Sequence, residues 1–151
     1  MDYDAFCSYS RADEPTVRRV VAALHERGVT TFVDRDSLPL GQPWPALLAK
    51  HIEDSRSVLV FVGPTEMGDW QQRERDLALQ RQTRERGFSV IPVLLPGVDD
   101  PGLGFLGLNT WSDLSRGIDD QNDWMPSREP SARYRRQPWL RSFRQNFLND
   151  K

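Results

Sequence analysis

A chain of 151 residues, with 38% hydrophobic and 28% charged side chains, is long enough to bury one core and suits a single globular domain. The net charge of -2 and a pI near 5.7 argue against a dedicated nucleic-acid binder. No apolar run approaches the roughly 20 residues of a membrane span and no basic-then-apolar signal sequence opens the chain, so we expect no membrane partner and a cytoplasmic location.

The cysteine and the two histidines are not predicted to form a disulfide, a reactive thiol or a metal site. The single cysteine, Cys7, excludes an internal disulfide, and its apolar surroundings predict an inert core thiol in a reducing compartment. The two histidines, His25 and His51, lie in predicted helices without partners at metal-ligand spacing, so we expect no metal.

The chain begins with a predicted strand at residues 3–10. Residues 11–15 form a loop with helix-start signals, in which Pro15 is tolerable in the first helical turn. Apolar residues at helical spacing then predict an amphipathic helix that Gly28 ends at its C′ position. Residues 29–33 are rich in β-branched side chains and predict a second strand. The apolar positions of the helix are Val17, Val20, Val21 and Leu24.

A long polar connection, residues 34–43, follows the second strand, and loops of this length are often functional or mobile. Residues 57–62 form a short, continuous apolar run bounded by turn residues, which predicts a central strand covered by helices on both faces. Between them lies a predicted helix with Trp44, Leu47, Leu48 and Ile52 at helical spacing.

The helix expected after the central strand carries a carboxylate on its inward side. Asp69 is placed to cap the first free amides, with Gln72 able to reach back. Burying Glu74 without compensation would cost several kcal/mol, so we expect this carboxylate to open into a polar cleft. The alternative is a surface charge that compensates the helix dipole. The side chains that share the inward face are Trp70, Glu74, Leu77 and Ala78.

A fourth strand follows at residues 88–95, after Gly87 marks the end of the preceding helix. Pro92 removes a hydrogen-bond donor from this strand, which places it at or near the sheet edge. Residues 109–114 predict a very short fifth strand.

The C-terminal part is less regular. Residues 115–137 show no secure periodicity, and residues 138–148 predict a last helix. We therefore divide the chain into a domain core, residues 1–114, and a C-terminal segment, residues 115–151, made of a linker and that helix.

Strands that alternate with helices predict an α/β, flavodoxin-like three-layer fold: a five-stranded parallel sheet in the order 2-1-3-4-5 with helices on both faces. Ligands then bind beyond the carboxyl ends of the first and third strands, where the strand order reverses. The loops at that point contain Ser10, Arg11 and residues 63–74, so the fold is expected to bring Glu74 and an arginine to one crevice.

Several of these segments resemble the signature boxes of Toll/interleukin receptor (TIR) domains. Tyr-Asp-Ala-Phe-Cys-Ser-Tyr-Ser at residues 3–10 resembles the first box, and Phe-Val-Asp at residues 32–34 through Leu38 and Gly41 resembles the second box with its flexible loop. The central strand followed by Trp-Gln-Gln-Arg-Glu at residues 70–74 resembles the third strand and the Trp-x-x-x-Glu segment.

The fourth strand, at residues 90–95, also resembles its counterpart in TIR domains, so that the resemblance covers residues 2–114. It departs at Gln71, where TIR domains often carry a cysteine, and in the tail from residue 115.

TIR domains divide into adaptors that act by self-association and enzymes that cleave the nicotinamide–ribose bond of NAD, the latter common in bacterial and plant immune systems. The resemblance implies the bacterial NAD-cleaving type, a hydrolase that yields nicotinamide and ADP-ribose or a cyclic ADP-ribose. NAD is then a substrate, and no cofactor is needed. The implied partners are other TIR protomers and a fused or separate sensor domain, in immune or anti-phage defence.

The resemblance implies Glu74 as the catalytic carboxylate. One carboxylate is enough, because nicotinamide in NAD is a cationic pyridinium that leaves as a neutral base, whereas an ordinary O-glycoside needs a second one to protonate its leaving group. Trp44 or Trp70 is expected to stack on the cationic ring and Arg11 to pair with the pyrophosphate. The alternatives are aromatic helix anchors and a solvated surface arginine. The other expected pocket residues are Phe6, itself a natural core residue, with Ser10, Asp34, Leu38 and Gly41.

Two other functions stay open. A non-enzymatic interaction module, either a signalling adaptor or a host-mimicking decoy, would bind partners and turn over no NAD. A flavodoxin-like nucleotide or cyclic-nucleotide binding module is a weaker alternative. The lack of a Gly-x-Gly-x-x-Gly turn after the first strand argues against hydride-transfer use of NAD.

Overall fold

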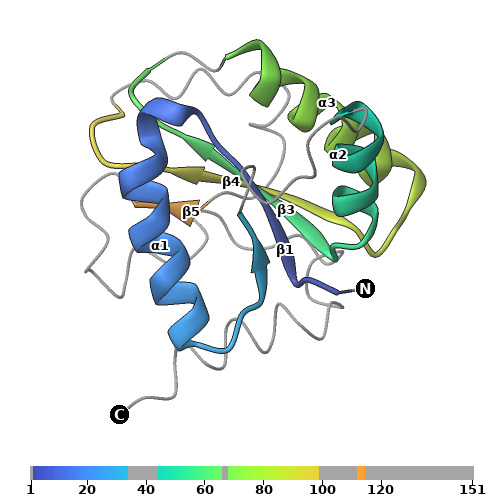
Figure 1. Ribbon diagram of the computed structural model, residues 1–151, viewed down its shortest axis with the longest axis horizontal. Helices are drawn as coiled ribbons and strands as arrows, with labels where there is room; N and C mark the ends of the chain where they lie inside the picture. The colour runs from blue at the N-terminus through green and yellow to red at the C-terminus, as the bar shows by residue number, and fades with distance from the viewer. Residues whose placement is uncertain (1, 34–43, 66–67, 99–111, 115–151) are drawn as a thin grey trace.

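The computed structural model describes residues 2–33, 44–65, 68–98 and 112–114. Its strands form one parallel five-stranded sheet in the order β2-β1-β3-β4-β5. Helix α1 covers one face of this sheet, and α2 and α3 lie together on the other (Figure 1). This confirms the predicted flavodoxin-like α/β fold. The elements are β1 (Ala5–Ser8), η1 (Arg11–Asp13), α1 (Glu14–Glu26), β2 (Thr31–Phe32), α2 (Trp44–Glu53), β3 (Ser57–Val62), α3 (Asp69–Arg84), β4 (Ser89–Leu94) and β5 (Ser112–Asp113).

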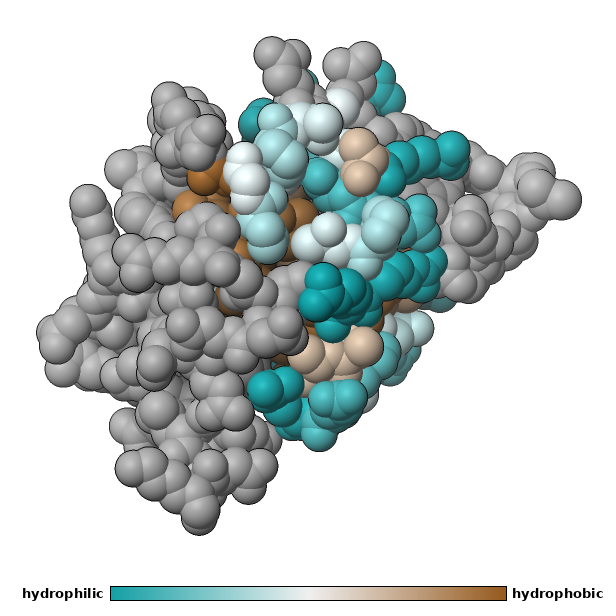
Figure 2. Space-filling view, turned by 90° about the vertical axis from the view of Figure 1, so that its left-hand side faces the viewer, coloured by the Kyte–Doolittle hydropathy of each residue, from teal (hydrophilic) through white to brown (hydrophobic). Residues whose placement is uncertain are grey.

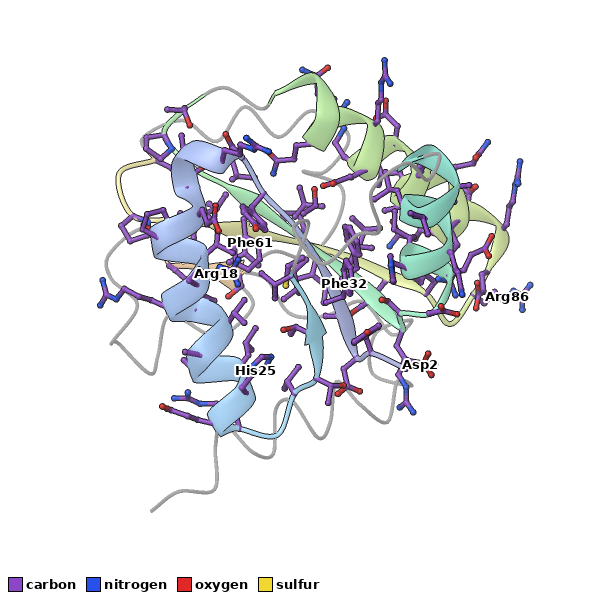
Figure 3. All side chains as sticks on the ribbon, in the orientation of Figure 1. Asp2, Arg18, His25, Phe32, Phe61 and Arg86 are labelled. Atoms are coloured by element: carbon purple, nitrogen blue, oxygen red, sulfur yellow. The ribbon has the colours of Figure 1, made fainter. Side chains whose placement is uncertain are left out.

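Alternate side chains of the strands build two apolar clusters, one on each face of the sheet. Cys7 and Phe61 belong to the cluster under α1, whereas Phe6 belongs to the cluster under α2 and α3. Figure 3 shows Phe61 on the α1 side and Phe32 on the α2 side. The sheet therefore separates two cores, and each helix is positioned by the face on which it packs.

Helix α1 forms as its sequence predicts. Pro15 lies in its first turn, and Gly28 follows its end with a φ of +79°, a conformation that favours glycine. On the side of the molecule where α1 lies, the described surface is mainly hydrophilic (Figure 2). The buried residues of the helix are the four predicted ones, Val17, Val20, Val21 and Leu24.

Strand β2 at one edge of the sheet is shorter than predicted, and two residues of β5 are described at the other. Strand β2 comprises only Thr31–Phe32, because its backbone pairs with β1 at these two positions alone. Strand β5 pairs only with Val93 and Leu94, the two residues of β4 that follow Pro92. Within the described residues, the proline therefore lies on the part of β4 that has one strand neighbour, which confirms its predicted place near the sheet edge.

Helix α3 departs from prediction at both ends and in its rotation. The N-cap position is Gly68, and Asp69 is the first helical residue, so the predicted Asp69 cap is wrong. The helix ends at Arg84, before the Gly87 expected to end it.

Leu77 is 37% exposed, although the sequence predicted that it faces the sheet. Of the α3 side chains that are described, those of Gln71, Glu74 and Ala78 are buried, and they also share one helical face. The face centred on Gln71 turns inward because the amide of that residue bonds the sheet, as described below.

Membrane spans and metal sites can be assessed for the described residues. In the described part, no helix is long and apolar enough to cross a membrane. Nor does that part gather three side chains suited to holding a metal ion. The predicted segment 115–151, with its last helix, lies outside the described residues, and so does the loop at 34–43.

Candidate functional site

The site lies where the strand order reverses, at the carboxyl ends of β1 and β3. The loop after β1 and the turn after β3 meet there, since the carboxylate of Asp13 lies against Gly63. A Cβ atom at position 63 would overlap with that carboxylate. The close approach requires a glycine, and it shows that the two loops expected to flank a ligand are neighbours.

Gln71, on the first turn of α3, joins the two strands at this point. Its Nε2 atom donates hydrogen bonds to the carbonyl oxygens of Phe61, at 2.7 Å, and of Ser8, at 3.3 Å. Only 3% of the residue is exposed. The amide therefore bridges β3 and β1 from the side of α3.

Glu74 follows one helical turn later and is completely buried, with 0% of its surface exposed. The carboxylate also affects Cys7 on β1. Burial raises the pKa of the Cys7 thiol to about 12, and the negative charge of Glu74 raises that pKa further, whereas the hydrogen bond with Thr31 lowers it. The sequence placed this side chain on the inward face, and the structure buries it there. The polar cleft expected around it stays a prediction.

Ser8 adds a further polar group at the end of β1. It is 0% exposed, and its Oγ atom has no hydrogen-bond partner among the described residues. By strand alternation it lies on the same face of the sheet as Phe6, the face that α2 and α3 cover. Buried polar side chains thus gather at the carboxyl edge of this face, whereas its middle is apolar.

The other predicted site residues are distributed around this point. Phe6 is 4% exposed and stacks on Phe32 with ring centroids 5.7 Å apart, as a core residue does. Ser10 is partly buried, and its carbonyl oxygen accepts the backbone N–H of Asp13 at 2.9 Å. Arg11 is exposed, so the described side chains do not bring its guanidinium against the buried Glu74.

Five predicted residues cannot be placed in the site. Asp34, Leu38 and Gly41 lie outside the described residues. The backbones of Trp44 and Trp70 begin α2 and α3, but their side chains are not among those that the structure describes. Their contacts with a substrate stay predictions.

Sequence reasoning missed two residues of the site. Gln71 carried a usable signal, because it shares a helical face with Glu74 and Ala78. Asp13 carried none beyond its place in a helix-start loop. It is 7% exposed, and burial raises the pKa of its carboxyl group. In the part of the chain that the structure describes, its Oδ2 atom has no hydrogen-bond partner.

The family model of the TIR domain matches residues 6–126. The chain belongs to the TIR domain family. Among functionally curated proteins, none matches this chain.

Solved TIR structures share the fold. The TIR domain of the Toll-related receptor TRR-2 from Hydra magnipapillata superposes with a TM-score of 0.63 at 19% identity, covering 95% of this chain and 98% of that one. At this identity the likeness shows the fold alone.

Two more similar sequences belong to larger proteins. The TIR domains of the activated Roq1 resistosome, which recognises the pathogen effector XopQ, are 29% identical with a TM-score of 0.57, over 67% of this chain and 61% of that one. A metazoan TIR-STING receptor from C. gigas, in complex with 2′,3′-cGAMP, is 29% identical with a TM-score of 0.60, over 82% of this chain and 40% of that one. This chain thus spans less than two thirds of either protein.

Proposed function

We propose that this TIR domain is an NAD hydrolase that cleaves the nicotinamide–ribose bond with Glu74 as its catalytic carboxylate. The observation that carries the proposal is the complete burial of Glu74 on the face of α3 that packs against β1, at the switch point of the sheet. A buried carboxylate costs folding free energy, so a protein that retains one at a ligand-binding edge has a functional use for it.

The chemistry fits a single carboxylate. As the bond from the ribose C1′ to the pyridinium nitrogen breaks, its electron pair goes to nicotinamide, which leaves as a neutral base. Positive charge then develops on the ribose, and Glu74 stabilises it through the hydroxyls or by direct attack on C1′. Exclusion of bulk water strengthens that electrostatic interaction. Water then adds to C1′ and releases a proton to give ADP-ribose, or a ring nitrogen of the adenine attacks to give a cyclic ADP-ribose.

The proposal includes assembly. Glu74 is buried in a single protomer, so substrate needs a rearrangement or a neighbouring protomer to reach it. We propose that self-association, with the loop at residues 34–41 as contact, completes the site in the manner of bacterial NAD-cleaving effectors. Two relatives at 29% identity, a resistosome that recognises a pathogen effector and a receptor bound to 2′,3′-cGAMP, support a role downstream of a sensor in immune or anti-phage defence.

Substrate contacts complete the proposal. Arg11, exposed at the mouth of the loop after β1, pairs with the pyrophosphate, and Ser10 and Asp34 line the pocket. Trp44 or Trp70 stacks on the nicotinamide ring. Leu38 and Gly41 belong to the loop that shapes the pocket, and Phe6 supports the apolar wall of the pocket from the core.

The test is chromatographic analysis of products after concentrated protein is incubated with NAD. Glu74→Ala should release nicotinamide at least about 1000-fold more slowly than wild type, because it removes the group that stabilises the transition state. The matched control is Asp76→Asn, which alters an exposed carboxylate of the same helix and should keep wild-type turnover. Wild-type protein that releases no nicotinamide when assembled, or a Glu74→Ala protein with full turnover, would contradict the proposal.

The second candidate is a non-enzymatic TIR interaction module, a signalling adaptor or a host-mimicking decoy. The same burial favours it in one respect, because a carboxylate with 0% exposure is closed to substrate in the isolated protomer. This function requires that wild-type protein assembles without turning over NAD and that Glu74→Ala leaves assembly intact. Sedimentation of both proteins alongside the NAD assay separates the two functions.

A further inference from the structure

Few of the α3 side chains that the structure describes make apolar contacts with the sheet. Among these described side chains, Ala78 is the one buried hydrophobic residue, and Leu79 packs partly against the same cluster. Leu77 is 37% exposed. Apolar burial is non-directional, so it stabilises a helix without fixing its exact rotation. Directional contacts are therefore needed to set the position of Glu74.

Gln71 supplies directional contacts at the right end of the helix. Its side-chain N–H groups donate to two carbonyl oxygens on neighbouring strands, those of Ser8 and Phe61. Two bonds from one amide to two strands fix both the height and the rotation of the first turn of α3. The N-cap residue Gly68 has no side chain that could perform this task.

The two carbonyl groups lie where backbone pairing between the strands ends. The last pair in the register of β1 with β3 is Ser8 with Val60, and Phe61 lies one residue beyond it. A buried carbonyl without a partner costs about 1 to 3 kcal/mol, so the amide of Gln71 replaces partners that the diverging strands no longer provide. The start of α3 is thereby coupled to the switch point itself.

Glu74 shares a helical face with Gln71, because residues three apart lie one turn from each other. We propose that Gln71 is a positioning residue, whose two donated hydrogen bonds hold Glu74 in the geometry needed for cleavage. This inference rests on the proposed NAD hydrolase function. Gln71 touches neither substrate nor reacting atoms: it acts through the helix that it fixes.

The first test compares steady-state kinetics of wild type and Gln71→Met, which keeps the length of the side chain and removes its donors. The kcat for nicotinamide release should fall about 10- to 100-fold, as small misplacements of a catalytic group do, while KM for NAD changes by less than about threefold. Assays run well below the melting temperature of each variant, so lost stability alone leaves kcat unchanged. Gln80→Met, an exposed glutamine of the same helix, is the control and should match wild type.

The second test needs no variant that might fail to fold. In the full chain labelled with 15N, the side-chain NH2 protons of Gln71 should exchange with solvent at least about tenfold more slowly than those of exposed Gln80, because they are buried and bonded to two carbonyls. Equal exchange rates overturn the inference.

The outcomes separate this inference from the function on which it rests. Active wild type with an unchanged kcat in Gln71→Met overturns the positioning role of Gln71 and leaves the hydrolase proposal standing. Wild type without nicotinamide release overturns the hydrolase proposal, and the catalytic part of this inference with it. A loss confined to KM also contradicts the inference, since it assigns Gln71 to substrate binding.

Discussion

Helices α1 and α3 cover opposite faces of one sheet and are held there by different forces. Every buried residue of α1 is aliphatic: Val17, Val20, Val21 and Leu24. Among the side chains of α3 that the structure describes, the buried ones are Gln71, Glu74 and Ala78. Among the described side chains, polar residues therefore predominate on the buried face of the helix that carries the proposed catalytic group.

The far end of α3 repeats this pattern. Arg81 donates from Nη1 to the carbonyl oxygens of Ile52 and Ser55, at the end of α2, and its guanidinium lies 4.1 Å from the centroid of the Phe88 ring. Together with Gln71, it fastens α3 at both ends by directional bonds. The comparison shows that the buried face of α1 mainly stabilises the fold. The polar contacts of α3 instead hold Glu74 in one position, and burying those polar groups costs desolvation free energy.

The largest expected effect distinguishes the two helices by the property that a substitution reduces, stability for α1 and turnover for α3. Leu24→Ala, in the core under α1, should lower the free energy of unfolding by about 2 to 5 kcal/mol and leave the turnover of the remaining folded protein unchanged. Glu74→Ala should show the reverse pattern, with the larger loss in turnover. Urea denaturation followed by tryptophan fluorescence, with NAD assays on the same samples, measures both. A Leu24→Ala protein with intact stability would remove the basis of the comparison.

The next effect concerns the far end of α3. Arg81→Met keeps the apolar contact but loses the hydrogen bonds to the carbonyls of Ile52 and Ser55, the ion pair with Glu85 and the cation–π contact, so unfolding should become easier by about 2 to 3 kcal/mol. Arg84→Met alters an exposed arginine of the same helix and should change stability by less than about 0.5 kcal/mol. Equal effects in the two variants would show that Arg81 does not fasten α3.

A smaller effect sharpens the comparison at the segments that precede the two helices. Gly63→Ala should destabilise the fold by about 1 to 3 kcal/mol, because its Cβ overlaps with the carboxylate of Asp13 just before α1. In an Asp13→Ala background the same change should be nearly neutral. A double-mutant cycle by thermal unfolding measures this coupling, and additive effects would mean that the two loops do not constrain each other.

The smallest effect is a pH dependence at Asp13. Burial raises the pKa of this carboxyl group above its ordinary value of 3.8, so the folded protein binds the proton more tightly than the unfolded chain does. The resulting stabilisation is complete below that ordinary value and is lost as the pH rises through the raised pKa. Asp13→Asn should therefore raise the melting temperature more at pH 7 than at pH 3.5. A gain that is equal at both pH values would contradict the shift.

The sequence was most informative where the structure depends on local pattern. The aliphatic spacing of α1, its end at Gly28 and the bounds of β3, Ser57–Val62, all follow from periodicity and turn residues that lie within a few positions of each other. The inward direction of Glu74 also follows, since its helical neighbours fix the face on which it lies.

Prediction failed where a distant partner decides. Periodicity alone allowed Leu77 or Gln71 on the inner face of α3, and hydrophobicity favoured Leu77. In the structure Gln71 lies on the inner face, because its side chain bonds the carbonyl of Ser8, which is 63 residues away in sequence. Strand β2 is short for a similar reason, because its length depends on where β1 offers it partners.

The sequence by itself determined the alternation of strands and helices, the family and the presence of an acidic residue on the inner side of α3, because each of these depends on residue types at short spacing. Only the tertiary structure decided that an amide bridges β1 and β3 beside that acid and that Asp13 packs on Gly63. Those contacts join backbone atoms and side chains that are remote in the chain. Local sequence patterns do not determine which backbone carbonyls lack a partner in a neighbouring strand.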